Sequence, residues 1–439
     1  MSEPADVAAQ LHIEDLWLGF RRGPGVLSVT ADGFVSFTPD RQTIQQPHGY
    51  GPASVSPRMH QPDAPAGSSP PPGQAKTVRK TASPSALSQA TRLRLTVMPG
   101  VVDHHVHLGL VDRMALSGGP IVEVHDLGWT LAEALSWRAA PPSGVSVRLA
   151  GPFHTAPGGY PAGRSWIPPA GVRAVHDAND ARSAVEHAKA AGVDAIKIAL
   201  HGDMPLLSDE LLDALVDAAH SAGLPAIVHA EGAGQAARAV MAGADLLVHA
   251  PFSEPLDEQT LRRSLSTPWI STLAIHDEPA RQIAALNIRR FRTLGGTVLY
   301  GTDMGNAPAG AEVNALELKL LGEAGLDGDD LIAAVTGHPG SPLAGRMFSP
   351  GGQPASYVDW QRSSTPGAHG GGPHTGQPVR TPGGHGTGLS AGPVSYSLIA
   401  SRTLISALPL PRDSACLVNW LNHCTRLDRC MLAQAPGGQ

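Results

Sequence analysis

Two histidines, His105 and His107, follow an apolar run within the stretch VMPGVVDHHVHLGLVD at residues 97–112. Alternate side chains of a β-strand point to the same face, so the two imidazoles would lie side by side at one strand end. Neutral imidazoles are common ligands of divalent metal ions. A lone His-x-His pair is weak evidence, however, because most histidines at strand ends are ordinary core or surface residues. A metal site therefore requires further ligands from other parts of the chain.

Four later apolar segments each carry one further polar residue of the kind that such a site needs. They are DAIKIAL with Lys197, AIVHAEG with His229, LLVHAPF with His249 and TVLYGTDMGN with Asp303. A lysine inside an apolar run is unusual, because burial of an unpaired ammonium group is costly and lowers its pKa. Imidazoles together with a carboxylate are the ligands that a borderline divalent metal prefers. The combination favours a metal centre over a set of unrelated core positions.

The elements that must position these residues are eight strand-like segments separated by helix-like stretches. In SDELLDALVDAAHSAG, for example, Ser208 is a plausible N-cap and Gly223 a helix stop. Eight such repeats over about 250 residues predict an α/β fold of the (β/α)8 TIM-barrel type, although doubly wound sheets also alternate. In TIM barrels the chemistry lies at the C-terminal ends of the strands. The expected strands are Leu95–His107, Ile121–Asp126, Val145–Ala150, Ala195–Leu200, Ala226–Ala230, Leu246–Ala250, Trp269–Ile275 and Thr297–Asp303.

The motif set resembles that of the amidohydrolase superfamily. PGVVDHHVH at residues 99–107 matches the family pattern PGxxDxHxH, and Lys197, His229, His249 and Asp303 follow in the family order. The stretches AGVDAIKIALHGD, AHSAGLPAIVHAEG, AGADLLVHAPF and LYGTDMGN are similar to the branch with prolidase-like and imidazolonepropionase-like members. The resemblance covers residues 92–345.

This resemblance implies a metal-dependent amidohydrolase, a hydrolase of carbon–nitrogen bonds other than peptide bonds, with an amide, lactam or peptide-like substrate. A hydroxide between two divalent ions, Zn²⁺ or alternatively Mn, Fe or Co, would be the nucleophile. Asp303 would be the catalytic residue that takes the proton and passes it to the leaving nitrogen. The implied ligands are His105, His107 and Asp303 for one ion, His229 and His249 for the second, and Lys197, carbamylated by CO2, as the bridge.

Three residues near the expected strand ends are candidate substrate contacts. Tyr160 and Arg164 lie in APGGYPAGRSW after the third strand, and His276 follows the seventh. An ordinary flexible loop is an equally good interpretation of the first two. The substrate itself stays open, because it depends on the loops at the barrel mouth. Three more histidines near strand ends, His125, His154 and His201, have no assigned role.

Members of this family surround the barrel with a small β-sandwich built from both chain ends. Residues 1–38 resemble its first strands, whereas 39–90 are a Pro/Ser-rich insertion that we predict to be disordered. The hydrolase barrel is expected at 91–345 and a remnant of the sandwich at 346–360. Residues 361–439 are predicted to be a low-complexity, largely disordered tail. The predicted fold is thus a (β/α)8 barrel with a small, incomplete β-sandwich.

Composition sets the remaining expectations for this chain of 439 residues. A formal net charge of −6 without a long basic run argues against nucleic acid or a membrane surface as a partner. We expect a small-molecule substrate and a cytoplasmic protein without a secretory signal; the sequence also allows a homo-oligomer. Two alternatives remain open. One is an esterase or phosphotriesterase-type activity on the same metal centre, and the other is a non-catalytic relic of the barrel.

Overall fold

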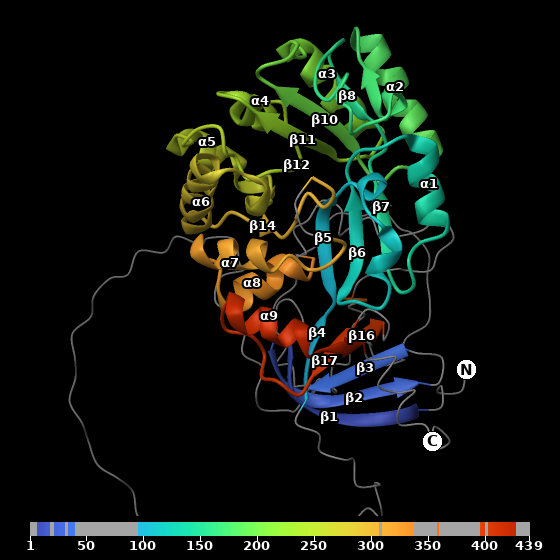
Figure 1. The fold of residues 1–439 in the computed structure, drawn as a ribbon, viewed down its shortest axis with the longest axis vertical. Coiled ribbons are helices and arrows are strands. Elements are labelled where there is room, and N and C mark those ends of the chain that lie inside the picture. Colours follow the sequence, from blue (N-terminus) through green and yellow to red (C-terminus); the bar gives the residue numbers. More distant parts are fainter. Residues whose placement is uncertain are drawn as a thin grey trace, which may run out of the picture.

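Two parts of different architecture make up the structure, a computed structural model shown in Figure 1. One part consists of parallel strands surrounded by helices, and the other is a sheet built from both ends of the chain. Nearly all of the predicted insertion 39–90 and of the predicted remnant 346–360 lies outside the described residues. The described residues are 7–17, 22–30, 34–39, 95–306, 310–337, 358–359, 396–399 and 403–426.

The strands of the first part are all paired in parallel. They form a seven-stranded sheet in the order β14-β13-β12-β11-β10-β8-β9 and a three-stranded sheet in the order β5-β6-β7. The predicted α/β class with a parallel sheet is confirmed. The strands are β5 (Val101–Val106), β6 (Ile121–Asp126), β7 (Ser146–Leu149), β8 (Phe153–Thr155), β9 (Val172–Ala174), β10 (Ile196–His201), β11 (Ala226–Glu231), β12 (Leu246–Leu247), β13 (Trp269–Ile270) and β14 (Val298–Leu299).

Backbone hydrogen bonds also connect the two parallel sheets to each other. The amide of His104 in β5 donates to the carbonyl of Tyr300, just after β14, over 3.1 Å. The amide of Asp194, before β10, donates to the carbonyl of Leu149 at the end of β7 over 2.8 Å. Strand β5 therefore lies beside β14, and β7 lies beside the start of β10, which is consistent with the predicted TIM barrel.

The predicted strand Leu95–His107 is divided at Gly100. Its first half, β4 (Thr96–Pro99), belongs to the sheet of the chain ends, and its second half is β5. Pro99 has no backbone N–H to donate, and a Cβ on Gly100 would lie 2.4 Å from Cγ1 of Val122. The chain thus leaves one sheet and enters the other through a close contact with β6. Strands β8 and β9 are additions that the sequence analysis did not predict.

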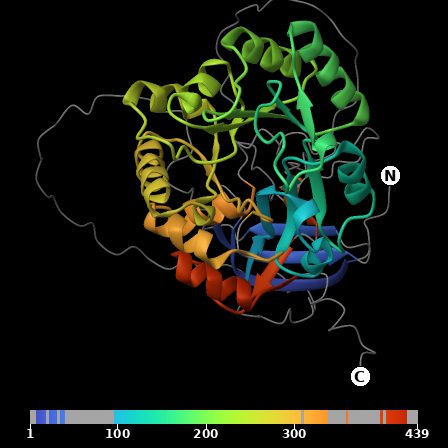
Figure 2. The same ribbon diagram turned by 45° about the horizontal axis from the view of Figure 1, so that its top comes forward.

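The helices lie around the outside of the parallel strands in both views (Figures 1 and 2). Helix α3 begins as predicted, because the Ser208 side chain accepts a hydrogen bond from the amide of Leu211, and its buried stripe includes Leu212 and Leu215. Within the described residues, no helix is both long enough and apolar enough to cross a bilayer. The helices are α1 (Leu131–Ala139), α2 (Ala178–Ala191), α3 (Asp209–Ser221), α4 (Gln235–Met241), α5 (Glu258–Arg263), α6 (Glu278–Thr293), α7 (Ala315–Glu323), α8 (Gly328–Val335) and α9 (Ser414–Asn422).

The second part is a single eight-stranded sheet in the order β15-β16-β3-β2-β1-β4-β17-β18. The chain ends therefore combine in one β-structure, as predicted, but the described residues contain one sheet and not the two facing sheets of a sandwich. Its strands besides β4 are β1 (Val7–Trp17), β2 (Arg22–Thr30), β3 (Phe34–Pro39), β15 (Val358–Asp359), β16 (Tyr396–Ile399), β17 (Thr403–Ser406) and β18 (Thr425–Arg426).

Residues 403–426 are ordered in the structure, although they fall in the tail predicted to be largely disordered. Helix α9 contacts α7, and the two lie side by side in Figures 1 and 2. Its Trp420 is fully buried and donates from Nε1 to Oγ1 of Thr96 over 2.9 Å. Leu417 and Leu421 lie on the same helical face and are also buried. A short apolar patch near residues 397–421 is visible in the sequence, but the Gly/Pro-rich composition around it favoured the prediction of a largely disordered tail.

Candidate active site

Five of the six predicted metal ligands lie in the C-terminal halves of the parallel strands or just after them, and the sixth, Lys197, is the second residue of β10. His105 and His107 lie at the end of β5, Lys197 in β10 and His229 in β11. His249 and Asp303 follow β12 and β14. Alternation along the strand explains why His105 and His107 lie side by side, because residues two apart in sequence share a face. All six side chains are buried, with at most 7% of any of these residues exposed.

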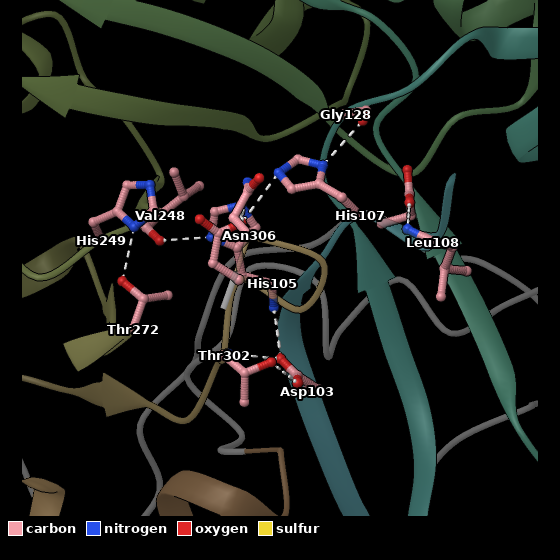
Figure 3. Close-up of polar contacts among 12 residues, drawn as sticks. Asp103, His105, His107, Leu108, Gly128, Val248, His249, Thr272, Thr302 and Asn306 are labelled. Carbon is pink, nitrogen blue, oxygen red and sulfur yellow. Dashed lines mark hydrogen bonds and ion pairs between the residues drawn. The ribbon is translucent and has the colours of Figure 1, made fainter. Parts of the chain in front are cut away.

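Asp303 lies beside His105 and His107, two histidines of the cluster that Figure 3 shows in part. Its Oδ1 is 3.3 Å from Nε2 of His107 and 3.5 Å from Nε2 of His105. The potential ligand atoms of His105, His249 and Asp303 all lie within 4.8 Å of one another, so these three residues could hold one metal ion. Asp303 has a positive φ of 51°, a backbone conformation that is unusual for a residue other than glycine.

The backbone orients the imidazoles of the His-x-His pair. Nδ1 of His105 lies 3.0 Å from the carbonyl oxygen of Val248, and Nδ1 of His107 lies 3.0 Å from that of Gly128 (Figure 3). A carbonyl can only accept, so each Nδ1 must carry a proton and donate it. In the neutral ring, the lone pair is then on Nε2, which faces Asp303.

Neutral histidines are also expected from burial. Burial lowers the pKa of His105 and of His249 well below the usual value, and it lowers the pKa of His229 as well. Nε2 of His105 and Nε2 of His229 are buried and make no hydrogen bond. A buried polar atom without a partner is costly, and a divalent metal ion is a natural partner for a neutral imidazole nitrogen. The residues present therefore fit a metal centre.

Lys197 is 1% exposed and lies in the same cluster. Its Nζ is 5.2 Å from the centroid of the Phe153 ring, and no described carboxylate lies within ion-pair distance of it. Burial lowers the pKa of Lys197 to about 7, against the opposing effect of Asp303 and Asp126. A large fraction of this amine is therefore neutral near pH 7, unlike an exposed lysine.

Two buried carboxylates that the sequence analysis did not single out support the site. Asp103 accepts hydrogen bonds from the amide of His105 and from both the amide and the hydroxyl of Thr302, and so joins the ends of β5 and β14 (Figure 3). Asp126 accepts from the amide of Leu108 over 2.8 Å, and its Oδ1 has no hydrogen-bond partner. Asp126 ends β6, so the rule that strand ends carry the chemistry could have identified it.

The predicted substrate contacts surround this cluster. The Tyr160 ring stacks on the His229 ring, with centroids 4.9 Å apart and an interplanar angle of 18°. Cζ of Arg164 lies 5.8 Å from the centroid of the Tyr160 ring. The His276 ring is 6.0 Å from that of His249, and its Nε2 is buried without a hydrogen bond. All three residues are thus close to the histidine cluster.

The unassigned histidines separate into two groups. His125 pairs with Glu123 over 3.0 Å, and His154 directs Nδ1 to the carbonyl of Lys197 over 3.1 Å, so neither joins the cluster. His201, in contrast, lies at the end of β10, with its ring 5.0 Å from that of Tyr160. The neighbouring Glu231, at the end of β11, was also missed by the sequence analysis, although it stands two residues after His229.

Comparison with known proteins finds similar folds among solved structures only. No model of a known protein family matches the sequence, and no curated protein matches it. Among solved structures, a Xaa-Pro dipeptidase with bound methionine in the active site is similar at a TM-score of 0.53 and 20% identity, covering 76% of this chain and 88% of that chain. An ochratoxinase from A. niger is similar at a TM-score of 0.53 and 16% identity, with 76% and 85% covered.

A molinate hydrolase is similar at a TM-score of 0.51 and 17% identity, with 77% of this chain and 86% of that chain covered. The resemblance predicted from the sequence is confirmed at the level of the fold. At such identities the likeness extends to the fold alone.

Proposed function

We propose that this protein is a metal-dependent hydrolase of the amidohydrolase superfamily that cleaves a C–N bond in an amide, lactam or peptide-like small molecule. The observation that carries the proposal is the convergence of four buried histidines, one aspartate and one lysine at the ends of parallel strands. The fold shared with solved hydrolases supports it. We also infer that the two parallel sheets form one closed (β/α)8 barrel, because hydrogen bonds link β5 to β14 and β7 to β10.

The residues of the cluster fit two divalent ions, for which Zn²⁺ is the first choice and Mn, Fe or Co are alternatives. Lys197 fits the bridging position if CO2 converts its amine to a carbamate. The neutral amine that burial favours is the form that reacts with CO2, and the product exchanges a costly buried cation for two oxygen ligands. The proposed assignment is His105, His107 and Asp303 for one ion, His229 and His249 for the other, and Lys197 for both. It differs from the group of three ligand atoms within 4.8 Å described above, in which His249 lies with His105 and Asp303.

Such ions, when bound, supply a Lewis acid for the substrate carbonyl and lower the pKa of water to near 7. Asp303 is placed to accept the proton of the attacking water and to deliver it to the leaving nitrogen. Nδ1 of His105 and Nδ1 of His107 donate to backbone carbonyls, so the Nε2 lone pairs of both rings would be available to the metal ion. Tyr160, with Arg164 beside it, and His276 would contact the substrate at the edge of the cluster.

Metal content and amide hydrolysis test the proposal together. We expect close to two divalent ions per chain by elemental analysis, turnover on a panel of dipeptides and lactams, and loss of turnover on chelation. Lys197→Ala should lower metal occupancy, and short carboxylic acids should partly restore activity by replacing the carbamate. Failure to bind metal even after reconstitution would contradict the proposal. A single ion with an unmodified Lys197 would instead indicate a mononuclear centre.

The Thr272 hydroxyl should be needed for tight metal binding. It lies 2.7 Å from Nδ1 of His249, and Thr272 is fully buried with a φ of 45° (Figure 3). Thr272→Val keeps the shape and leaves Nδ1 without a partner, so we expect metal affinity to fall by about 10–100-fold. Thr267→Val is the control, since this buried hydroxyl donates to Ala244 away from the cluster. Equal affinity in both variants, measured by competition with a chromophoric chelator, would contradict this role.

A further inference from the structure

Glu231 lies beside Nε2 of His229, a proposed ligand atom on β11 that makes no hydrogen bond. It follows His229 by two residues on the same strand, so the two side chains share a face. Its Oε2 lies 3.3 Å from Nε2 of His229, the buried atom that makes no hydrogen bond. The His229 side chain is 6% exposed, whereas that of Glu231 is 33% exposed, so the carboxylate extends from the wall of the site towards its mouth.

The backbone holds this arrangement in place. Strands β10 and β11 are parallel, with His201 in register with Glu231, and the amide of Gly202 donates to the carbonyl of Glu231 over 2.9 Å. The two following loops touch, since a Cβ on Gly232 would lie 3.0 Å from the Cα of Gly202. The Glu231 backbone therefore cannot move far from His201 without separating the two strands.

The second carboxylate oxygen faces a different side chain. Nδ1 of His201 accepts from the amide of Asp203 over 3.4 Å, so the proton of the neutral ring is on Nε2. That Nε2 faces Oε1 of Glu231 at 3.6 Å. One oxygen of Glu231 is thus directed to His201 and the other to His229. A metal-binding carboxylate commonly has this division, with one oxygen on the ion and the other held by a neighbouring group.

We propose that Glu231 is an additional metal ligand and binds the same ion as His229, with His201 as the residue that positions its carboxylate. This inference rests on the proposed function. Metal–nitrogen and metal–oxygen bonds are about 2.0–2.2 Å long, so two ligand atoms on one ion lie roughly 3 Å apart or slightly more. The separation of 3.3 Å between Oε2 and Nε2 satisfies this requirement. Glu231 gives the His229 side of the cluster a carboxylate, as Asp303 does for the side of His105 and His107.

Metal affinity tests this inference without relying on turnover. Purified full-length protein is stripped, reloaded with Co²⁺ and titrated against a chromophoric chelator, with the Co²⁺ absorption spectrum recorded in parallel. Glu231→Gln should weaken one of the two ions by more than about 100-fold, because loss of a ligand costs more than loss of its supporting residue. His201→Asn should weaken the same ion by about 10-fold. Both variants should change the absorption spectrum.

Glu254→Gln is the matched control. Glu254 is another carboxylate, in the loop between β12 and α5, and it accepts a hydrogen bond from the amide of Gly234, which an amide oxygen can also accept. We expect both ions to bind this variant as they bind the unmodified protein. If Glu231→Gln also keeps both ions at full affinity, Glu231 is not a ligand, whatever the substitution does to KM. If the unmodified protein binds no metal, the proposed function itself fails.

Discussion

Asp303→Asn should reduce the rate of amide hydrolysis by at least about 10²-fold while the histidines retain most of the metal. The amide keeps the shape of the side chain and one oxygen that can bind an ion. It removes the negative charge and the group that can carry a proton between water and the leaving nitrogen. Its Oδ1 lies 3.3 Å from Nε2 of His107 and 3.5 Å from Nε2 of His105, so the carboxylate is directly beside two of the proposed metal ligands.

Substrates with different leaving groups separate proton transfer from metal binding. An ester with a good leaving group needs little protonation, so Asp303→Asn should slow its hydrolysis less than that of the matched amide. The measurement is kcat/KM for both substrates at equal metal content. Asp277→Asn is the control, because Asp277 caps α6 and Asn is an equally good N-cap. Equal losses on amide and ester would show that Asp303 mainly holds metal, and no loss would place the proton carrier elsewhere.

Trp420→Ala should destabilise the protein by about 3–5 kcal/mol, the range for removal of a large buried aromatic side chain. Trp420 is fully buried within α9 and joins that helix to β4 through its hydrogen bond to Thr96. The substitution leaves a cavity and removes the indole N–H that donates to the buried Thr96 hydroxyl, although this hydroxyl keeps its own hydrogen bond to the Leu408 carbonyl. The free energy of unfolding, measured in urea at fixed metal content, should show the full loss.

Two further variants serve as controls for the loss of unfolding free energy in Trp420→Ala. Trp420→Phe keeps most of the apolar volume and should be destabilised by less than the alanine variant. Leu316→Ala, on α7 with 42% of the residue exposed, should change stability by no more than about 0.5 kcal/mol. A loss below about 1 kcal/mol for Trp420→Ala would mean that α9 does not contribute to the core of the protein.

Local periodicity was enough to predict the parallel α/β class and to select the six residues of the cluster. The alternation of a strand places His105 beside His107, and an apolar run around Lys197 requires its burial, whichever strands are neighbours. The start of α3 at Ser208 is similarly local, because the cap bonds to an amide three residues away. Features of this kind depend only on a few consecutive residues, which the sequence displays directly.

Contacts between distant segments were decided by the tertiary structure alone. The division at Gly100 depends on packing against Val122, and the order of residues 403–426 depends on a surface for Trp420 that β4 and α7 provide. Glu231 has the spacing of a site residue, but many acids at strand ends face solvent. Alternation along β11 places it beside His229, but only the register of β10 with β11 brings it beside His201. Sequence periodicity determines which side chains share a face, whereas long-range packing determines which distant residues that face contacts.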